Sequence, residues 1–143
     1  MPRTSNSAFK PLWGLFAILL GVSAITVISK MTRAKEIVPW RTDLSAAQEE
    51  AKRDSKPLLL YFTASWCGPC QEMKSATWSD AGVEAKLRNY VPVKIDIDAD
   101  QPTALQYQIN GIPAFVLLDR EGNVARETSG FMYPVQFLAW LEE

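Results

Sequence analysis

The chain of 143 residues contains no histidine and only two cysteines, Cys67 and Cys70. Without histidine it cannot form a Ser-His-Asp or Cys-His catalytic site, a histidine-ligated metal site or a histidine pH switch. Two cysteines are too few for a fold stapled by several disulfides, and one chain cannot supply the four Cys or His ligands of a structural zinc site. We therefore expect no metal site.

The chain has little net charge, only −1. Residues 1–40 carry five basic residues and one acidic residue, whereas residues 41–143 carry ten basic and fifteen acidic residues. Nucleic-acid binding needs a basic face, so the acidic larger part of the chain argues against a nucleic-acid partner. The basic N-terminal part suits a membrane surface.

An uncharged and largely apolar run, residues 12–29, is flanked by Lys10 and Lys30. It is long enough to cross a bilayer, which predicts a single transmembrane helix after a short basic tail of residues 1–11. The alternative is a signal peptide cleaved after the small residues 22–24, which would leave a secreted domain. A buried core helix is disfavoured, because the run is apolar on every face.

Residues 30–42 are charged and contain Pro39, which interrupts regular structure, so we predict a linker there. The remaining residues, 43–143, have the length of one ordinary domain. Nothing in the chain repeats at a fixed period.

The hydrophobic pattern of the domain predicts alternating helices and strands. The apolar run 57–63 is typical of a buried central strand, and the alternation of apolar residues over 91–97 is typical of a second strand. Further strands are predicted at 114–119 and 124–128, joined by a turn, and helices at 43–54, from 67 to about 76, near 80–87, at 102–108 and from 134 onward. We expect strands separated by helices to pair in parallel and the last two to form an antiparallel hairpin. The predicted fold class is α/β, with a mixed central sheet and helices on both faces.

The two cysteines form the motif Cys67-Gly68-Pro69-Cys70, placed between a strand and a helix. The free N–H groups and dipole at a helix N-terminus favour a thiolate at Cys67, and thiol–disulfide exchange requires a thiolate. Cys70, one turn further, can attack a mixed disulfide on Cys67. Pro69 is tolerated because first-turn N–H groups lack partners, and Gly68 leaves the sulfur accessible to a partner backbone.

Two other uses of the motif are open but weaker. It could be half of a zinc site completed by a second chain. It could also be a purely structural disulfide, although a four-residue loop removes little unfolded-chain entropy. We therefore expect no cofactor, only a redox-active disulfide between Cys67 and Cys70.

Several motifs together resemble the thioredoxin superfamily over residues 41–143. They are the run 60–65 before Trp66 and the cysteine motif, the tripeptide 111–113, and Gly130. Gly130 would allow close approach to the site, or would only interrupt a strand.

The segments 75–80 and 96–98 are more specific. They resemble the thioredoxin-like domain of membrane thiol–disulfide interchange proteins of the bacterial periplasm. The apolar run 12–29 fits that subgroup better than a free cytosolic thioredoxin.

The resemblance implies roles for individual residues. Cys67 would be the attacking thiol and Cys70 the resolving thiol. Pro113 would be the cis-proline that faces the disulfide, with the Ile112 backbone pairing with an extended client segment; otherwise Pro113 is an ordinary strand-start proline. Trp66 would shape the contact surface beside the thiol, or is simply a packed aromatic.

One position departs from the family pattern. Thioredoxins usually carry a buried acid six residues before the first cysteine, as proton acceptor for the second, and here that residue is Tyr61. The neighbouring lysine of the family is kept as Lys94. A neutral tyrosine cannot take a proton at neutral pH. We therefore expect Cys70 to lose its proton to water or hydroxide, with Tyr61 serving as a core residue.

These observations predict a membrane-tethered thiol–disulfide oxidoreductase that reduces protein disulfides on the extracytoplasmic, periplasmic side. The Gly-Pro dipeptide between the cysteines is that of reducing family members. The expected partners are protein disulfide or dithiol clients and a separate electron donor, because the chain has no further cysteine. The alternatives are an oxidase or isomerase of the same fold, or a non-catalytic module that binds a client or a metal.

Overall fold

The computed structural model describes residues 35–143. The predicted tail 1–11, the predicted transmembrane segment 12–29 and the first part of the predicted linker, residues 30–34, lie outside the described residues. No helix within residues 35–143 combines the length and the apolar composition that a membrane crossing requires.

Every helix and strand predicted for the domain is present, with ends shifted by no more than two residues. The order is α2 (Leu44–Asp54), β1 (Leu58–Thr63), α3 (Gly68–Ala76), α4 (Ala81–Leu87), β2 (Val91–Asp96), α5 (Gln101–Gln106), β3 (Ala114–Leu118), β4 (Val124–Ser129) and α6 (Pro134–Glu142). The predicted α/β class is confirmed.

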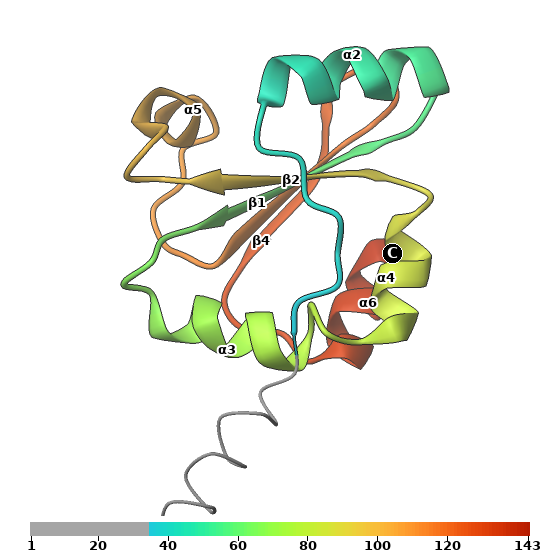
Figure 1. Ribbon diagram of the computed structural model, residues 1–143. Helices are drawn as coiled ribbons and strands as arrows, with labels where there is room; N and C mark the ends of the chain where they lie inside the picture. The colour runs from blue at the N-terminus through green and yellow to red at the C-terminus, as the bar shows by residue number, and fades with distance from the viewer. Residues whose placement is uncertain (1–34) are drawn as a thin grey trace, which may run out of the picture. The chain divides into compact units, whose positions relative to one another are not determined.

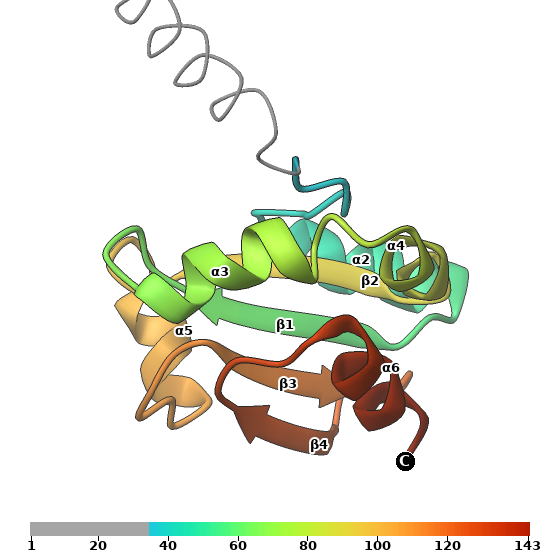
Figure 2. The ribbon, with the colours of Figure 1, turned by 90° about the horizontal axis from the view of Figure 1, so that it is seen from below.

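The four strands form one mixed sheet in the order β2-β1-β3-β4 (Figure 2). β1 and β2 are parallel, as predicted, and β3 and β4 form the predicted antiparallel hairpin. The expectation of a parallel β3 is wrong, because β3 runs antiparallel to β1. The six residues of α5 span about 9 Å, less than half of the roughly 20 Å of a six-residue strand. α5 by itself does not run back along the length of β2, and β3 begins at the end of the sheet where β2 ends.

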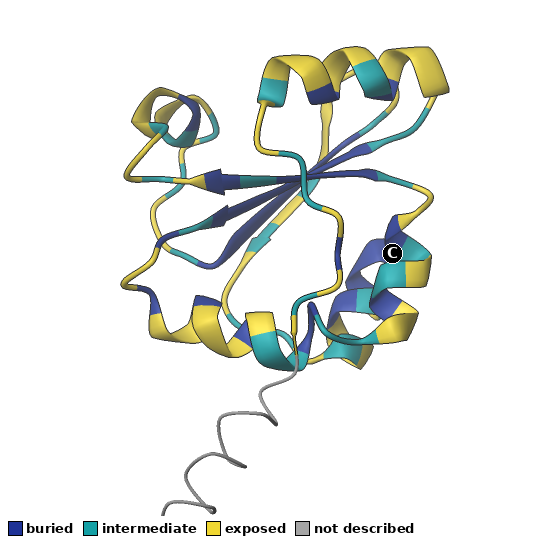
Figure 3. Cartoon of the chain, in the orientation of Figure 1, coloured by how far each residue is buried: buried dark blue, intermediate teal, exposed yellow. Residues whose placement is uncertain are grey.

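Helices cover both faces of the sheet, as predicted (Figure 1). Side chains of α3, α4 and α6 pack with Leu59 and Tyr61 of β1, while those of α2 and α5 pack with Leu58, Leu60 and Phe62. This alternation follows from the two-residue period of a strand. Figure 3 shows β1, β2 and β3 largely buried between helices whose outer faces are exposed, whereas the edge strand β4 has no buried residue.

Residues 35–42 are not a free linker but pack against the domain, which corrects the prediction for this part of 30–42. Val38 is buried, the N–H of Ile37 donates to the carbonyl of Trp78 at 2.8 Å, and Arg41 forms a parallel bridge with Val93 of β2. Figure 1 shows this N-terminal segment in cyan, passing the edge strand β2 on its way to α2. The apolar side chain of Val38 gains burial here, which the charged composition of 30–42 does not reveal.

Candidate functional site

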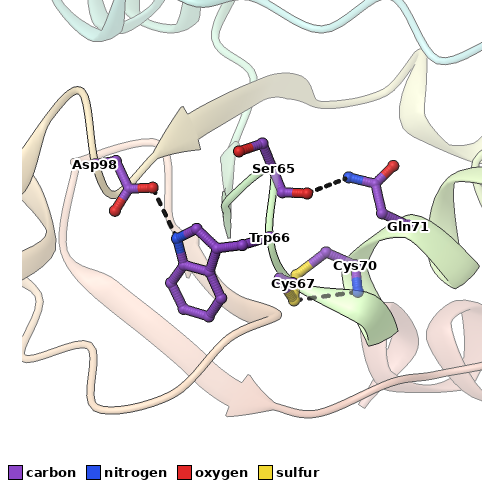
Figure 4. The surroundings of a disulfide bond; sticks show 6 residues. All are labelled: Ser65, Trp66, Cys67, Cys70, Gln71 and Asp98. Carbon is purple, nitrogen blue, oxygen red and sulfur yellow. Dashed lines mark hydrogen bonds between the residues drawn. A yellow bond between two sulfur atoms is a disulfide. The ribbon is translucent and has the colours of Figure 1, made fainter.

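The cysteine motif lies between the end of the buried strand β1 and the first turn of α3, as predicted. Cys67 and Cys70 form a disulfide with their Cα atoms 5.2 Å apart (Figure 4). Cys67 is the N-cap of α3, and its Sγ accepts a hydrogen bond from the backbone N–H of Cys70 at 3.2 Å. This places the Cys67 sulfur at the positive end of the helix, where a thiolate is favoured once the disulfide is reduced. Pro69 occupies the first turn of α3, where it removes no intrahelical bond.

The access of the two sulfurs differs little in the disulfide form. Cys67 is 4% exposed and Cys70 is 2% exposed, so both are buried, and the open approach expected for Cys67 is not visible in this state. The neighbouring Gly68 is exposed, and a Cβ atom there would meet no heavy atom within 4 Å. The open surface of the motif is therefore provided by Gly68 and the residues around it.

Trp66 is the large apolar residue of this open surface, with 66% of its area exposed. Its indole N–H donates to Oδ2 of Asp98 at 2.8 Å, so the ring is held beside the disulfide by a residue that follows β2 (Figure 4). An exposed aromatic ring with a fixed orientation suits contact with another protein. Asp98 was not predicted as a site residue, and its position in the 96–98 segment was the only signal in the sequence.

The loop before β3 also contacts the cysteines, through Ile112. The Ile112–Pro113 bond is cis, as the resemblance implies, and the Ile112 side chain packs against the buried cluster that contains Cys67 and Cys70. The carbonyl of Pro113 accepts a hydrogen bond from the N–H of Gly130 at 2.8 Å. Gly130 has φ +106, a conformation that favours glycine, and no crowding around a Cβ is seen. The structure thus places Ile112 against the cysteines and joins Gly130 to Pro113, the residue that follows Ile112.

Tyr61 lies in the aromatic core beneath the motif. It is 2% exposed, and its ring stacks on that of Phe115 with centroids 5.4 Å apart. Burial raises the pKa of Tyr61, so its hydroxyl stays protonated at neutral pH and cannot serve as a base. The structure agrees with Tyr61 as a core residue.

Lys94 lies opposite Tyr61 in the register of β1 and β2. Its Nζ donates to Oε1 of Glu36, and only 13% of the Glu36 side chain is exposed. Glu36 was not predicted as a site residue. The sequence carries no signal for it, because it lies far upstream of the cysteines in the segment predicted to be a linker.

A pocket of about 140 Å³ connects this ion pair with the disulfide. Glu36, Tyr61, Cys70 and Lys94 all line it. The site therefore has two sides: an exposed one at Trp66 and Ile112 that can meet a client, and an inner one at Cys70 that contains charged groups. A dithiol so placed can exchange electrons with a disulfide brought to the exposed side.

Residues 44–143 match the family of the thioredoxin-like domain. The chain is 33% identical over 98 residues to the thiol:disulfide interchange protein DsbD of Yersinia pestis (strain Pestoides F), covering 64% of this chain and 16% of that protein. It is 35% identical over 89 residues to the TPR repeat-containing thioredoxin TDX of Arabidopsis thaliana, covering 62% of this chain and 22% of that protein.

Among solved structures, the C-terminal domain of DsbD from Neisseria meningitidis in the oxidised form superposes with a TM-score of 0.61 at 26% identity, covering 72% of this chain and 97% of that one. The chain spans only 16% of the DsbD relative from Yersinia pestis, and the similarity to these proteins lies in one domain.

Proposed function

This chain belongs to the family of thioredoxin-like domains and is a thiol–disulfide oxidoreductase, and we propose that it reduces protein disulfides while tethered to a membrane by residues 12–29. The observation that carries the proposal is the Cys67–Cys70 pair at the N-terminus of α3, beside an exposed Trp66. Its location next to open surface argues against a disulfide that only stabilises the fold.

The reaction begins from the reduced dithiol. The Cys67 thiolate attacks one sulfur of the client disulfide, and the other client sulfur leaves with the electron pair and takes a proton. The Cys70 thiol then loses its proton, and its sulfur attacks the Cys67 sulfur of the mixed disulfide. The second client sulfur leaves as a thiol, so two electrons have passed to the client and Cys67–Cys70 is the oxidised product.

The client would meet the exposed side of the site. Ile112 packs next to the cysteines, so its backbone would pair with an extended client segment, and Trp66 would supply an apolar contact. The name of the DsbD relative describes thiol:disulfide interchange, which supports a protein partner of this kind. Because the chain has only two cysteines, the electrons that regenerate the dithiol come from a separate donor.

The proposed location follows from the N-terminal part of the sequence. The apolar run 12–29 would anchor the chain, with the domain on the extracytoplasmic, periplasmic side. The similarity to thiol:disulfide interchange proteins supports this assignment. A secreted domain, released after signal cleavage, is the alternative.

Two measurements on the full chain in detergent test the proposal. With a dithiol reductant present, it should reduce the disulfides of a model protein catalytically; client binding without turnover would instead indicate a non-catalytic module. Equilibration with glutathione should give a reduction potential below about −200 mV, the range of reducing members. A value near about −120 mV would indicate an oxidase and would overturn the proposed direction.

A further inference from the structure

The pocket beside Cys70 contains several groups that can carry charge. Its ionisable lining residues are Glu36 from the N-terminal segment, Tyr61 from β1, Lys94 and Asp96 from β2, and Cys70 and Lys74 from α3. In the reaction proposed above, the Cys70 thiol must lose a proton here. The question is which of these groups receives it.

Among the described residues that line the pocket, only the carboxylates of Glu36 and Asp96 are candidate acceptors. Burial raises the pKa of Tyr61, so its hydroxyl is neutral, and a lysine ammonium is a hydrogen-bond donor without an acceptor site. Asp96 is exposed, and its Oδ1 accepts the N–H of Asp98 at 3.0 Å. The side chain of Glu36 is only 13% exposed, so it is the more shielded of the two carboxylates that line this pocket.

Glu36 is held firmly in place. The next residue, Ile37, donates its N–H to the carbonyl of Trp78 at 2.8 Å, and Val38 is buried in the core. The Lys94 ammonium that binds Glu36 also lies 5.4 Å from the ring centroid of Trp40. The carboxylate is therefore pre-positioned, and no loop has to close to bring it to the pocket.

We propose that Glu36, positioned by Lys94, accepts the proton of the Cys70 thiol when Cys70 resolves the mixed disulfide. The pocket volume of about 140 Å³ has room for a water, so the proton passes directly or through one water. As the carboxylate takes the proton, the Cys70 sulfur attacks the Cys67 sulfur, and the bond between Cys67 and the client breaks. The inference rests on the proposed function and replaces the expectation that bulk water or hydroxide is the acceptor.

The resolving step can be measured alone. Single-turnover reduction of a model disulfide follows both steps in the reduced full chain, while Cys70→Ser reports only the first attack. We expect Glu36→Gln to slow resolution at neutral pH by at least about tenfold and to leave the first attack unchanged. The wild type should show a shallow pH profile, whereas Glu36→Gln should speed up by about tenfold per pH unit as hydroxide takes over.

Matched variants separate this role from a loss of packing. Glu50→Gln breaks the ion pair with Arg41, outside the pocket, and should keep the wild-type profile. Asp96→Asn should also keep it. Tyr61→Asp combined with Glu36→Gln supplies a new carboxyl from β1 and should restore a shallow profile. Glu36→Asp retains the carboxylate and should stay shallow too, with circular dichroism confirming that each variant is folded.

The outcomes distinguish the two proposals. If Glu36→Gln is folded and resolves with the wild-type rate and pH profile, Glu36 is not the acceptor, although the enzyme function stands. A steep profile for Glu36→Asp, equal to that of Glu36→Gln, would overturn the inference as well. If the wild type itself reduces no disulfide, the proposed function fails first.

Discussion

The sulfur atoms of Cys67 and Cys70 have different surroundings although both residues are buried. The Cys67 sulfur accepts an N–H at the start of α3 and neighbours the open surface at Gly68. Cys70 lines the inner pocket with Glu36 and Lys94. In the proposed reaction, Cys67 would attack the client beside the open surface, and Cys70 would resolve the mixed disulfide from the pocket, one turn of helix further on.

This division gives a prediction for the two serine variants. Cys67→Ser should abolish disulfide reduction, because no thiolate is left at the helix N-terminus. Cys70→Ser should accumulate a mixed disulfide between Cys67 and the client, visible on non-reducing gels. Equal alkylation rates of both thiols in the reduced protein, or a Cys70→Ser variant that still releases reduced client, would contradict it.

At the scale of elements, aspartates begin three helices of the domain. Asp43, Asp80 and Asp100 cap α2, α4 and α5, each accepting a backbone N–H with a side-chain oxygen. The first two caps lie at the start of the helices predicted at 43–54 and near 80–87. Asp80 matters for the site indirectly, because α4 packs Val83 and Leu87 into the same core as Tyr61.

We expect Asp80→Ala to lower the free energy of unfolding by about 1 kcal/mol. The substitution leaves the N–H of Val83, now bonded at 2.9 Å, without its side-chain acceptor. Asp80→Asn retains an acceptor oxygen and should unfold close to the wild type. Urea unfolding of the three proteins measures the difference, and a wild-type midpoint for Asp80→Ala would show that the cap contributes nothing.

The stability of the whole molecule should depend on pH through the ion pair that ties the N-terminal segment to α2. Arg41 donates from Nε to Glu50 at 3.0 Å, and this hydrogen bond lowers the pKa of Glu50. A carboxyl with a lower pKa in the folded state adds stability above its unfolded pKa. That stability disappears as the pH falls through the folded pKa.

The wild type should therefore be more stable than Glu50→Gln at neutral pH, and the difference should shrink as the pH drops below about 4. Denaturant unfolding at neutral and acidic pH measures both values. A difference that stays constant with pH would mean that packing, and not the charge of Glu50, accounts for the effect.

Membrane attachment is the second property of the whole chain that can be tested. If residues 12–29 anchor it, the expressed protein should sediment with membranes, resist alkaline extraction and keep its original N-terminus. Leu19→Arg combined with Leu20→Arg should weaken insertion, since each charge costs about 2.5–3.5 kcal/mol near the centre of a bilayer. A soluble product that begins after Ala24 would establish the secreted alternative.

The sequence alone determined much of this protein because much of it is encoded locally. The apolar run 57–63 is buried strand, Asp43 and Asp80 start helices, and the cysteine spacing defines the redox chemistry. Each of these features depends on residues within one or two turns of one another, and such patterns survive in the sequence. The cis bond before Pro113 was predictable only through family resemblance.

The tertiary structure decided what depends on contacts between distant segments. Residue type does not show that β3 pairs antiparallel with β1, nor that the segment 35–42 packs on the domain and pairs with β2 through Arg41. The approach of Glu36 to Cys70 follows from the second of these facts, because the edge strand β2 carries Lys94 to the pocket. A partly buried charge pair such as Glu36 and Lys94 forms only when packing brings both partners together, and that information exists in the folded chain and not in any local pattern.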